Sequence, residues 1–363
     1  MRRTPLRFRR FAALVLAALL PLAASAAPWE LTLESDRHSD FSSIDDLRDD
    51  NAAGYRARFG RNLAYVQEEV RLQRREGAWS LSLLGRSSAT LVGNRDAIEA
   101  LRHSRGLGRD ASDRHFDVHA HLRGFAGAGV EVERGFVLEP QWSGALLVQA
   151  LALTRWRERE IRGAADFVGA TSTYTFDLRS SELNDRLQFP FQQPQGAAGA
   201  GLLFGGDLAW GRGPWSARAA LRDVGLLHWR GVPQQDFTLS TSTRAIDAGG
   251  FVVFRPLLQG RNTQSGLTRS APWRAQVSAG WQATERGSLQ AGARWFRGFG
   301  ALPSVGWTQR FGQLETGATW QFHEQRLVLD ARWGGWRVYV GADRLDGVHS
   351  RVLGVAYSRP LPF

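Results

Sequence analysis

The chain has 363 residues, of which 46 are basic, 35 are acidic and none is cysteine. Without cysteine there is no disulfide and no thiolate chemistry. The basic excess is carried by arginine alone and spread along the chain, so it lacks the clustering of a nucleic-acid-binding surface. The 40 glycines and 14 tryptophans argue against a helical bundle and favour an all-β fold.

The first 26 residues have the three parts of a secretory signal peptide. Arginines come first, an apolar run follows, and Ala24-Ser25-Ala26 offers the small residues of a cleavage site. A retained membrane anchor is the alternative, but the apolar run is shorter than the ~20 residues that span a bilayer. We therefore expect cleavage after Ala26 and a mature domain over residues 27–363, in which no apolar run is long enough for a transmembrane helix.

Two long polar connections are expected in the first third, at 35–54 and 93–113. The acidic stretch DFSSIDDLRDD, Asp40–Asp50, can form a short helix with carboxylates in its first turn, which the helix dipole favours. It lacks the glycine and terminal glutamate spacing of a calcium loop, so a solvated outer loop is favoured over a cation site. A second short helix is expected at Asn94–Ser104. Whether these connections plug a lumen stays open.

The stretch RHFDVHAHLR reads as a strand with a polar face. His115, Asp117, His119, His121 and Arg123 share that face, and apolar residues alternate with them. Imidazoles two residues apart on a strand could bind zinc or form a proton-sensitive pore lining. A water-facing strand carries polar residues in any case, so we predict pore-lining residues here, with no metal and no cofactor.

Strand alternation is clearest in the last third of the chain. In RAQVSAGWQ, Ala275, Val277, Ala279 and Trp281 fall on one face, and the other face is polar or glycine. The same pattern recurs in segments of about ten residues up to the end of the chain. Boundaries between 142 and 256 are less distinct, so we predict about 16 strands, with a range of 14–18.

Alternation alone does not separate a soluble sandwich from a membrane barrel. The tryptophans favour the barrel, because several flank tight turns, as Trp333 and Trp336 flank Gly334-Gly335. Outer-membrane barrels carry such aromatic girdles at both interfaces. We expect long polar connections at 35–54, 93–113, 179–196 and 259–272 and short ones at 74–78, 124–127, 211–214, 284–287 and 334–335. Their arrangement along the chain predicts an even number of antiparallel strands with short periplasmic turns and long outer loops. The fold class predicted is an antiparallel transmembrane β-barrel.

Two stretches resemble known families. GVAYSRPLPF, Gly354–Phe363, alternates up to a terminal aromatic residue and resembles the carboxyl-terminal assembly signal of Gram-negative outer-membrane proteins, although Pro360 and Pro362 depart from it because each lacks a ladder donor. The resemblance implies recognition of Phe363 by the barrel-assembly machinery. RDVGLLHWRG, Arg222–Gly231, is similar to a stretch of fatty-acid-transporter-like barrels. That resemblance implies passage of hydrophobic compounds, often through a lateral opening.

The sequence thus predicts an outer-membrane, porin-like channel or transporter for small solutes. We expect its wall to contact outer-membrane lipid, and the sequence is compatible with an oligomer. Arginines on predicted inward faces suggest weak anion preference, because guanidinium groups concentrate anions. A plugged structural or assembly barrel and a barrel hydrolase remain alternatives, but we predict no enzyme, since no catalytic motif stands out. The predicted pore-lining arginines, besides Arg123, are Arg71, Arg274, Arg294, Arg326, Arg332 and Arg337.

Overall fold

The computed structural model describes residues 28–49, 51–108, 112–189, 198–241, 244–246, 252–254 and 257–359. The predicted signal peptide and Phe363 lie outside the described residues. The prediction of an all-β antiparallel barrel is confirmed. The strands are β1 (Trp29–Ser39), β2 (Arg61–Glu76), β3 (Trp79–Asn94), β4 (Arg114–Glu139), β5 (Trp142–Val168), β6 (Thr173–Asn184), β7 (Ala198–Arg212), β8 (Trp215–Ser240), β9 (Arg244–Ile246), β10 (Val252–Phe254), β11 (Leu258–Ser270), β12 (Arg274–Gln282), β13 (Gly287–Phe296), β14 (Gly300–Phe311), β15 (Leu314–Gln321), β16 (Arg326–Trp333), β17 (Trp336–Ala342) and β18 (Ser350–Arg359).

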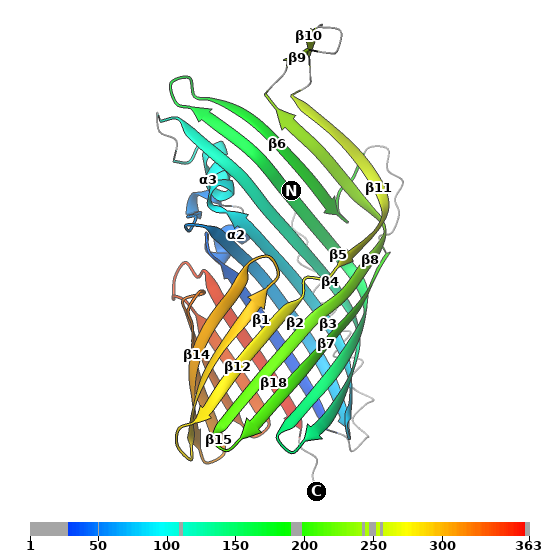
Figure 1. Ribbon diagram of the computed structural model, residues 1–363, viewed down its shortest axis with the longest axis vertical. Helices are drawn as coiled ribbons and strands as arrows, with labels where there is room; N and C mark the ends of the chain where they lie inside the picture. The colour runs from blue at the N-terminus through cyan, green and yellow to red at the C-terminus, as the bar shows by residue number, and fades with distance from the viewer. Residues whose placement is uncertain are drawn as a thin grey trace.

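Fourteen strands close into the barrel. The ring runs from β12 in chain order to β18, continues through β1 to β5, and closes through β7 and β8 back to β12 (Figure 1). The last strand pairs with the first, from Trp29 opposite Arg359 to His38 opposite Ser350. This closure leaves the sheet without an edge in the barrel, as a strand wall in hydrocarbon requires.

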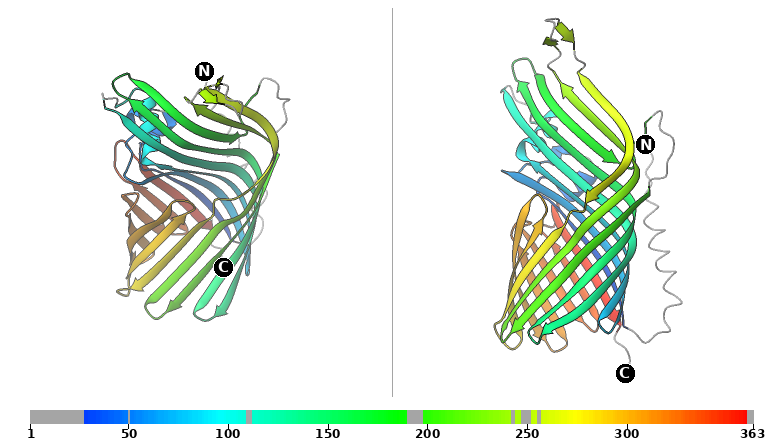
Figure 2. Two further views of the ribbon diagram at one scale, coloured as in Figure 1. Left: turned by 45° about the horizontal axis from the view of Figure 1, so that its top comes forward. Right: turned by 45° about the vertical axis from the view of Figure 1, so that its right-hand side comes forward.

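Two further strands, β6 and β11, rise above the barrel on one side. Strand β6 pairs with the upper parts of β5 and β8, while β7 pairs with their lower parts. Strand β11 likewise pairs with Leu226–Leu239 of β8, and β12 with Trp215–Arg222. Strands β4, β5, β6, β8 and β11 therefore form a tall extension over one half of the rim (Figure 2).

One end of the barrel has only short turns, and the long connections lie at the other end, together with the short turns after β13 and β15. Turns of two residues join β2 to β3 and β16 to β17, and both include glycines in the left-handed region, Gly77, Gly334 and Gly335. At the other end, residues 40–60 contain α2 (Ile44–Asp49) and η2 (Ala52–Gly54), and α3 (Arg95–Ser104) follows β3. The predicted asymmetry of connection lengths is confirmed.

The outer face of the barrel is apolar. Leu81 and Leu83 of β3 and Leu327 and Leu329 of β16 are each 44–54% exposed, while the residues that alternate with them point inward. Tryptophans collect next to the short turns, where Trp215 stacks on Trp281 across β8 and β12. This is the apolar band with an aromatic girdle that a bilayer requires of a barrel. No helix in the described part of the chain has the length and apolar character to cross a membrane.

The described parts of the two long connections of the first third pack on the outer side of the wall. Phe41, Tyr55 and Ile98 form a buried cluster with Ala64 of β2 and Leu91 of β3. Ala64 and Leu91 alternate with lumen-facing residues of their strands, so they point outward. The apolar residues of these segments therefore cover the wall, while Asp36 and Asp40 of the first segment point into the barrel toward Arg294 and His323.

Two expected connections are strands instead. Gly124–Gly127 reads as a turn in the sequence, but it lies inside β4. A side-chain carbon added at Gly127 would lie 2.7 Å from the carbonyl oxygen of Ala152, so this glycine allows close approach of neighbouring backbone. The polar segment 259–272 belongs mostly to β11, which lies above the apolar band and can be polar on both faces.

Candidate functional site

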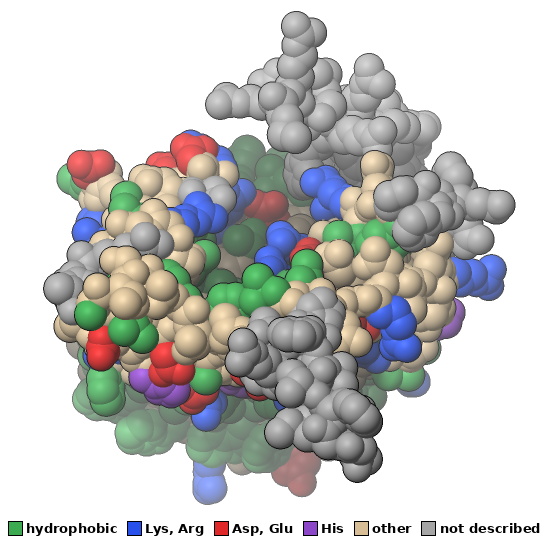
Figure 3. All heavy atoms as spheres, turned by 90° about the horizontal axis from the view of Figure 1, so that it is seen from above, with side chains coloured by type: hydrophobic (Ala, Val, Ile, Leu, Met, Phe, Trp, Pro, Cys, Tyr) green, Lys and Arg blue, Asp and Glu red, His purple; other side chains and the backbone are tan. Residues whose placement is uncertain are grey.

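The candidate functional site is the lumen of the barrel. Seen from above, the molecule is hollowed at its centre, and basic, acidic and hydrophobic side chains lie within the hollow (Figure 3). Below the rim, side chains from separate parts of the wall meet in two layers. We call them the central crossing and the upper crossing.

The central crossing is built on an ion pair between Arg86 of β3 and Asp223 of β8. Both guanidinium NH2 groups donate to the carboxylate, at 2.6 and 2.8 Å. The two strands are separated along the wall by β4, β5 and β7, so this bidentate pair spans part of the lumen. Arg86 is 6% exposed and Asp223 3%, which removes both charges from bulk water. Paired buried charges of this geometry are held firmly, because separating them would leave each one unsolvated.

A β-bulge directs Asp223 into the lumen. The register between β7 and β8 shifts between Phe204 and Gly206, and Asp223 has a φ of 65°. The extra residue lets Arg222 and Asp223, which are adjacent in the chain, both face inward. Arg222 donates to Asp207 of β7, and Asp223 binds Arg86.

Further side chains extend the central crossing to the rest of the wall. Arg274 of β12 lies 3.1 Å from Asp223 and donates to Gln67 of β2, which lies across the barrel. On the other side, Arg86 donates to Gln149 at 2.9 Å. The chain of contacts then continues through Glu131, Arg71 and Glu69.

The upper crossing joins β1, β2, β13 and β16. Asp36 accepts hydrogen bonds from Arg294 at 2.9 Å and from Arg326 at 2.8 Å. Tyr65 of β2 stacks on Phe296 of β13 with ring centroids 4.7 Å apart, although these strands lie on opposite sides of the ring. Glu324, in the turn after β15, accepts from Arg294 and from the Tyr65 hydroxyl. In this conformation the side chains of both crossings lie across the lumen.

A polar cavity of about 320 Å³ lies between the central crossing and the short turns. Its basic side chains outnumber its acidic ones, and Asp207 is bonded to Arg218 at 3.0 Å and to Arg222. The cavity therefore has a positive balance. The charged residues in its lining are Arg71, Arg75, Arg218, Arg222, Glu133 and Asp207.

Six of the predicted pore-lining arginines lie on inward faces of the barrel strands. Arg71 and Arg274 belong to the central crossing, and Arg294 and Arg326 to the upper crossing. The other two lie nearer the short turns. Arg332 is 3.4 Å from Glu315, and Arg337 lies over the ring of Tyr339.

The predicted histidine row lies high on β4, on the inner face of the extension. His115 bonds to Asp166 of β5 at 2.6 Å, and this carboxylate raises the pKa of His115. His121 and Arg123 both bond to Glu158 of β5, at 3.3 and 2.6 Å.

The two remaining residues of the row, Asp117 and His119, are bound through their backbones to the start of α3. The side chain of Asn94 donates to the carbonyl of Asp117 and accepts from the backbone N–H of His119. The row therefore joins β4 to β5 and to α3 above the barrel.

Sequence reasoning did not identify Asp223, Arg86 or Asp36 as lumen residues. The bulge that turns Asp223 inward leaves no periodic signal, because it interrupts the alternation on which the prediction depends. A second cluster was also not identified, in which His38, Asp40 and His323 meet at the rim.

Burial at the rim alone would raise the pKa of Asp40. Hydrogen bonds from His323 and His38 hold it well below its usual range.

No family model matches the sequence, and no curated protein matches it. Among solved structures, a TodX deletion mutant described as a monoaromatic hydrocarbon channel is 11% identical, with a TM-score of 0.44, and 94% of this chain and 92% of that one are covered. The Ralstonia pickettii toluene transporter TbuX is 8% identical, with a TM-score of 0.34 and coverage of 93% and 90%. The Escherichia coli outer-membrane protease OmpT is 8% identical, with a TM-score of 0.27 and coverage of 92% and 96%.

Proposed function

We propose that this chain is an outer-membrane channel for small polar solutes, closed in the present conformation by the two crossings. The observation that carries the proposal is the buried Arg86–Asp223 pair, which spans part of a polar lumen inside an apolar wall. A barrel of this strand number has room for an aqueous path unless its interior is filled. Here the side chains of the two crossings lie across it, and side chains can move aside without any change in the wall.

The barrel would lie in the outer membrane, into which it would insert after the signal peptide is removed. The exposed leucines and tryptophans of the wall would contact lipid, and the final strand would be recognised during assembly. The hydrogen-bonded ring supports this placement, because a closed ladder satisfies backbone groups that lipid cannot.

Weak anion preference is part of the proposal. In the cavity near the short turns four arginines face two carboxylates, so anions are favoured there. In the crossings the arginines are neutralised by carboxylates, which keeps the preference weak in the closed conformation. Opening the central crossing would expose Arg86 and Arg274 to the solute path and strengthen it.

The test is planar-bilayer recording under a salt gradient. Wild-type protein is expected to show rare openings. Asp223→Asn removes the carboxylate that holds Arg86 and Arg274, so channel openings should become frequent. The reversal potential should also move toward the equilibrium potential of the anion. The matched control is Asp166→Asn, which changes the same group on the extension above the barrel and should conduct like wild type.

The same crossings favour a second candidate, a permanently closed barrel that serves as a structural or assembly scaffold. It predicts that neither wild type nor Asp223→Asn conducts, although both are folded, and that a periplasmic partner co-purifies. Cation selectivity in the Asp223→Asn variant would contradict the anion preference while leaving the channel function in place.

A further inference from the structure

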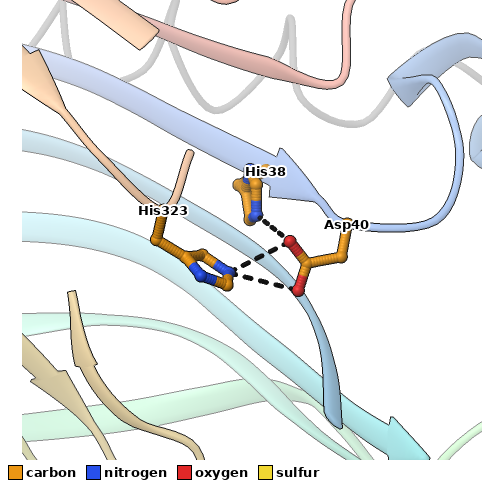
Figure 4. Close-up of side chains that lie close together, drawn as sticks. All are labelled: His38, Asp40 and His323. Carbon is orange, nitrogen blue, oxygen red and sulfur yellow. Dashed lines mark hydrogen bonds and ion pairs between the residues drawn. The ribbon is translucent and has the colours of Figure 1, made fainter. Parts of the chain in front are cut away.

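A cluster of two imidazoles and one carboxylate lies at the rim of the barrel, next to the upper crossing, where the His38 ring contacts that of Tyr65. His38 is near the end of β1, Asp40 follows that strand, and His323 lies in the turn between β15 and β16 (Figure 4). The Nε2 atoms of both histidines lie 3.0 Å from Oδ1 of Asp40. One ligand atom from each of the three residues lies within 4.8 Å of the others.

These distances suit a small metal ion. Zinc lies about 2.0–2.2 Å from histidine nitrogen and carboxylate oxygen, so tetrahedral ligand atoms are about 3.4 Å apart. The two nitrogen–oxygen distances are 3.0 Å, and all three donor atoms lie within 4.8 Å of one another. After small movements of the two imidazole rings, an ion would fit between the three donor atoms. Its bonds to these atoms would replace the hydrogen bonds that now join the rings to Asp40. Two imidazoles and a carboxylate are a ligand set that zinc and its neighbours in the first transition row accept.

The surroundings hold the three groups in place. The side chains of His38 and Asp40 are fully buried, and that of His323 is 22% exposed, which leaves a route for an ion and a position for a water ligand. Asp40 also accepts from the backbone N–H of Leu63 at 2.6 Å and lies 2.8 Å from Nη1 of Arg58. Ligating carboxylates usually have such outer donors, because each oxygen has a second lone pair.

Ring contacts fix the histidines. The His38 ring lies 5.5 Å from that of Tyr65 and 5.4 Å from that of His323, and His323 also contacts Phe299 edge-on at 4.9 Å. In the described part of the chain Nδ1 of His38 has no hydrogen-bond partner, so packing orients this ring. An arrangement fixed by packing before the ion arrives lowers the entropic cost of binding.

We propose that His38, Asp40 and His323 bind a divalent transition-metal ion of the zinc class, which fastens the turn between β15 and β16 to the end of β1. The site is separate from the histidine row on β4, and it does not depend on whether the barrel conducts.

The experiment uses the full mature protein, folded in detergent and freed of metal with a chelator. Cobalt(II) serves as the probe because its visible absorption reports low coordination by nitrogen and oxygen, and zinc is then added as the competitor. We expect one cobalt per chain, displaced by zinc. His323→Ala, in a partly exposed turn, should weaken affinity at least about tenfold, as loss of a ligand should cost at least as much as loss of an outer-shell partner.

His119→Ala and His121→Ala are the matched controls, since they remove imidazoles from the alternative row and should leave cobalt affinity unchanged. His38→Ala and Asp40→Asn should behave like His323→Ala if they fold, and His323→Ala alone decides the matter if they do not. Absence of a saturable cobalt spectrum in wild type, equal affinity in His323→Ala, or loss of binding in a control variant would each overturn the proposal. Zinc should also raise the unfolding midpoint of wild type but not of His323→Ala.

Discussion

At the scale of single residues, Asp223 is the most informative position in the molecule. It is one of three described non-glycine residues with positive φ, together with Ser172 and Gln325. Aspartate and asparagine tolerate this region better than other residues with a side chain. Asp223→Asn therefore keeps the backbone and removes only the charge, which makes it the cleanest change in the lumen.

Substitution of Asp223 should lower the free energy of unfolding more than substitution of Arg86. Asp223→Asn leaves the buried Arg86 without a carboxylate, a loss of about 3–5 kcal/mol in the free energy of unfolding. Arg86→Gln should cost less, because Asp223 keeps Arg274 at 3.1 Å. Urea unfolding of the two variants and of the double variant measures both costs and their coupling. Equal costs, or strict additivity, would show that the pair does not hold the lumen closed.

His115 should titrate above the ordinary value for histidine. The Asp166 carboxylate favours the protonated ring, so the pKa of His115 is raised in the folded protein. The stabilisation this pair supplies is present below the unfolded pKa of about 6.5 and is lost as pH rises through the higher folded pKa. NMR titration of the His115 ring measures it, and Asp166→Asn should lower the pKa toward 6.5. An unchanged value in Asp166→Asn would show that the pair does not form in solution.

At the scale of elements, the inward glycines of β7 make room for large apolar rings. A side-chain carbon at Gly199 would lie 2.6 Å from the Trp229 ring and 3.0 Å from Leu153. Trp229 and Leu153 belong to a buried cluster on the lumen side of β5, β7 and β8. The strand therefore needs glycine at this position for packing, since its φ does not require it.

Gly199→Ala should destabilise the barrel by about 1–3 kcal/mol, the usual cost of overpacking. Gly211→Ala on the same strand is the matched control, because the nearest atom to its added carbon is 3.9 Å away. Unfolding midpoints in denaturant compare the two. Trp229→Leu should restore part of the loss in Gly199→Ala. Equal stability of Gly199→Ala and Gly211→Ala would show that β7 does not pack closely against Trp229.

The sequence predicted elements well where one rule applied along the whole segment. Leu327 and Leu329 of β16 are outward, as the alternation with period two requires. The rule failed where a strand served two environments. Strands β4, β5 and β8 continue from the apolar band into the extension. Their length and mixed composition are the reason that the sequence predicted a turn at 124–127 inside β4 and indistinct boundaries in β5 and β8.

The sequence predicted only part of the candidate site, for a related reason. Alternation shows that Arg294 and Arg326 point inward, because it is a local property of each strand. Their partner Asp36 is more than 250 positions away in the chain. Only ring closure brings these groups together, and one sequence carries no signal of contacts between distant strands.

At the scale of the whole molecule, stability depends on the seam between β1 and β18. Val355 lies opposite Leu33 of β1 and Val338 of β17, in the middle of the wall. Val355→Pro should prevent folding, because proline removes a ladder donor that lipid cannot replace. Wild type should run compact on a gel unless boiled, and Val355→Pro should run as unfolded chain at any temperature. Val355→Ala, which keeps the donor, should resemble wild type.

Strand β8 joins the barrel to the extension. Its lower residues, up to Arg222, hold β12 in the barrel, and its upper residues, from Leu226, hold β11 in the extension. Asp223 occupies the joint between these two stretches. A force on the extension would therefore reach that joint along one continuous backbone and act on the ion pair between Arg86 and Asp223.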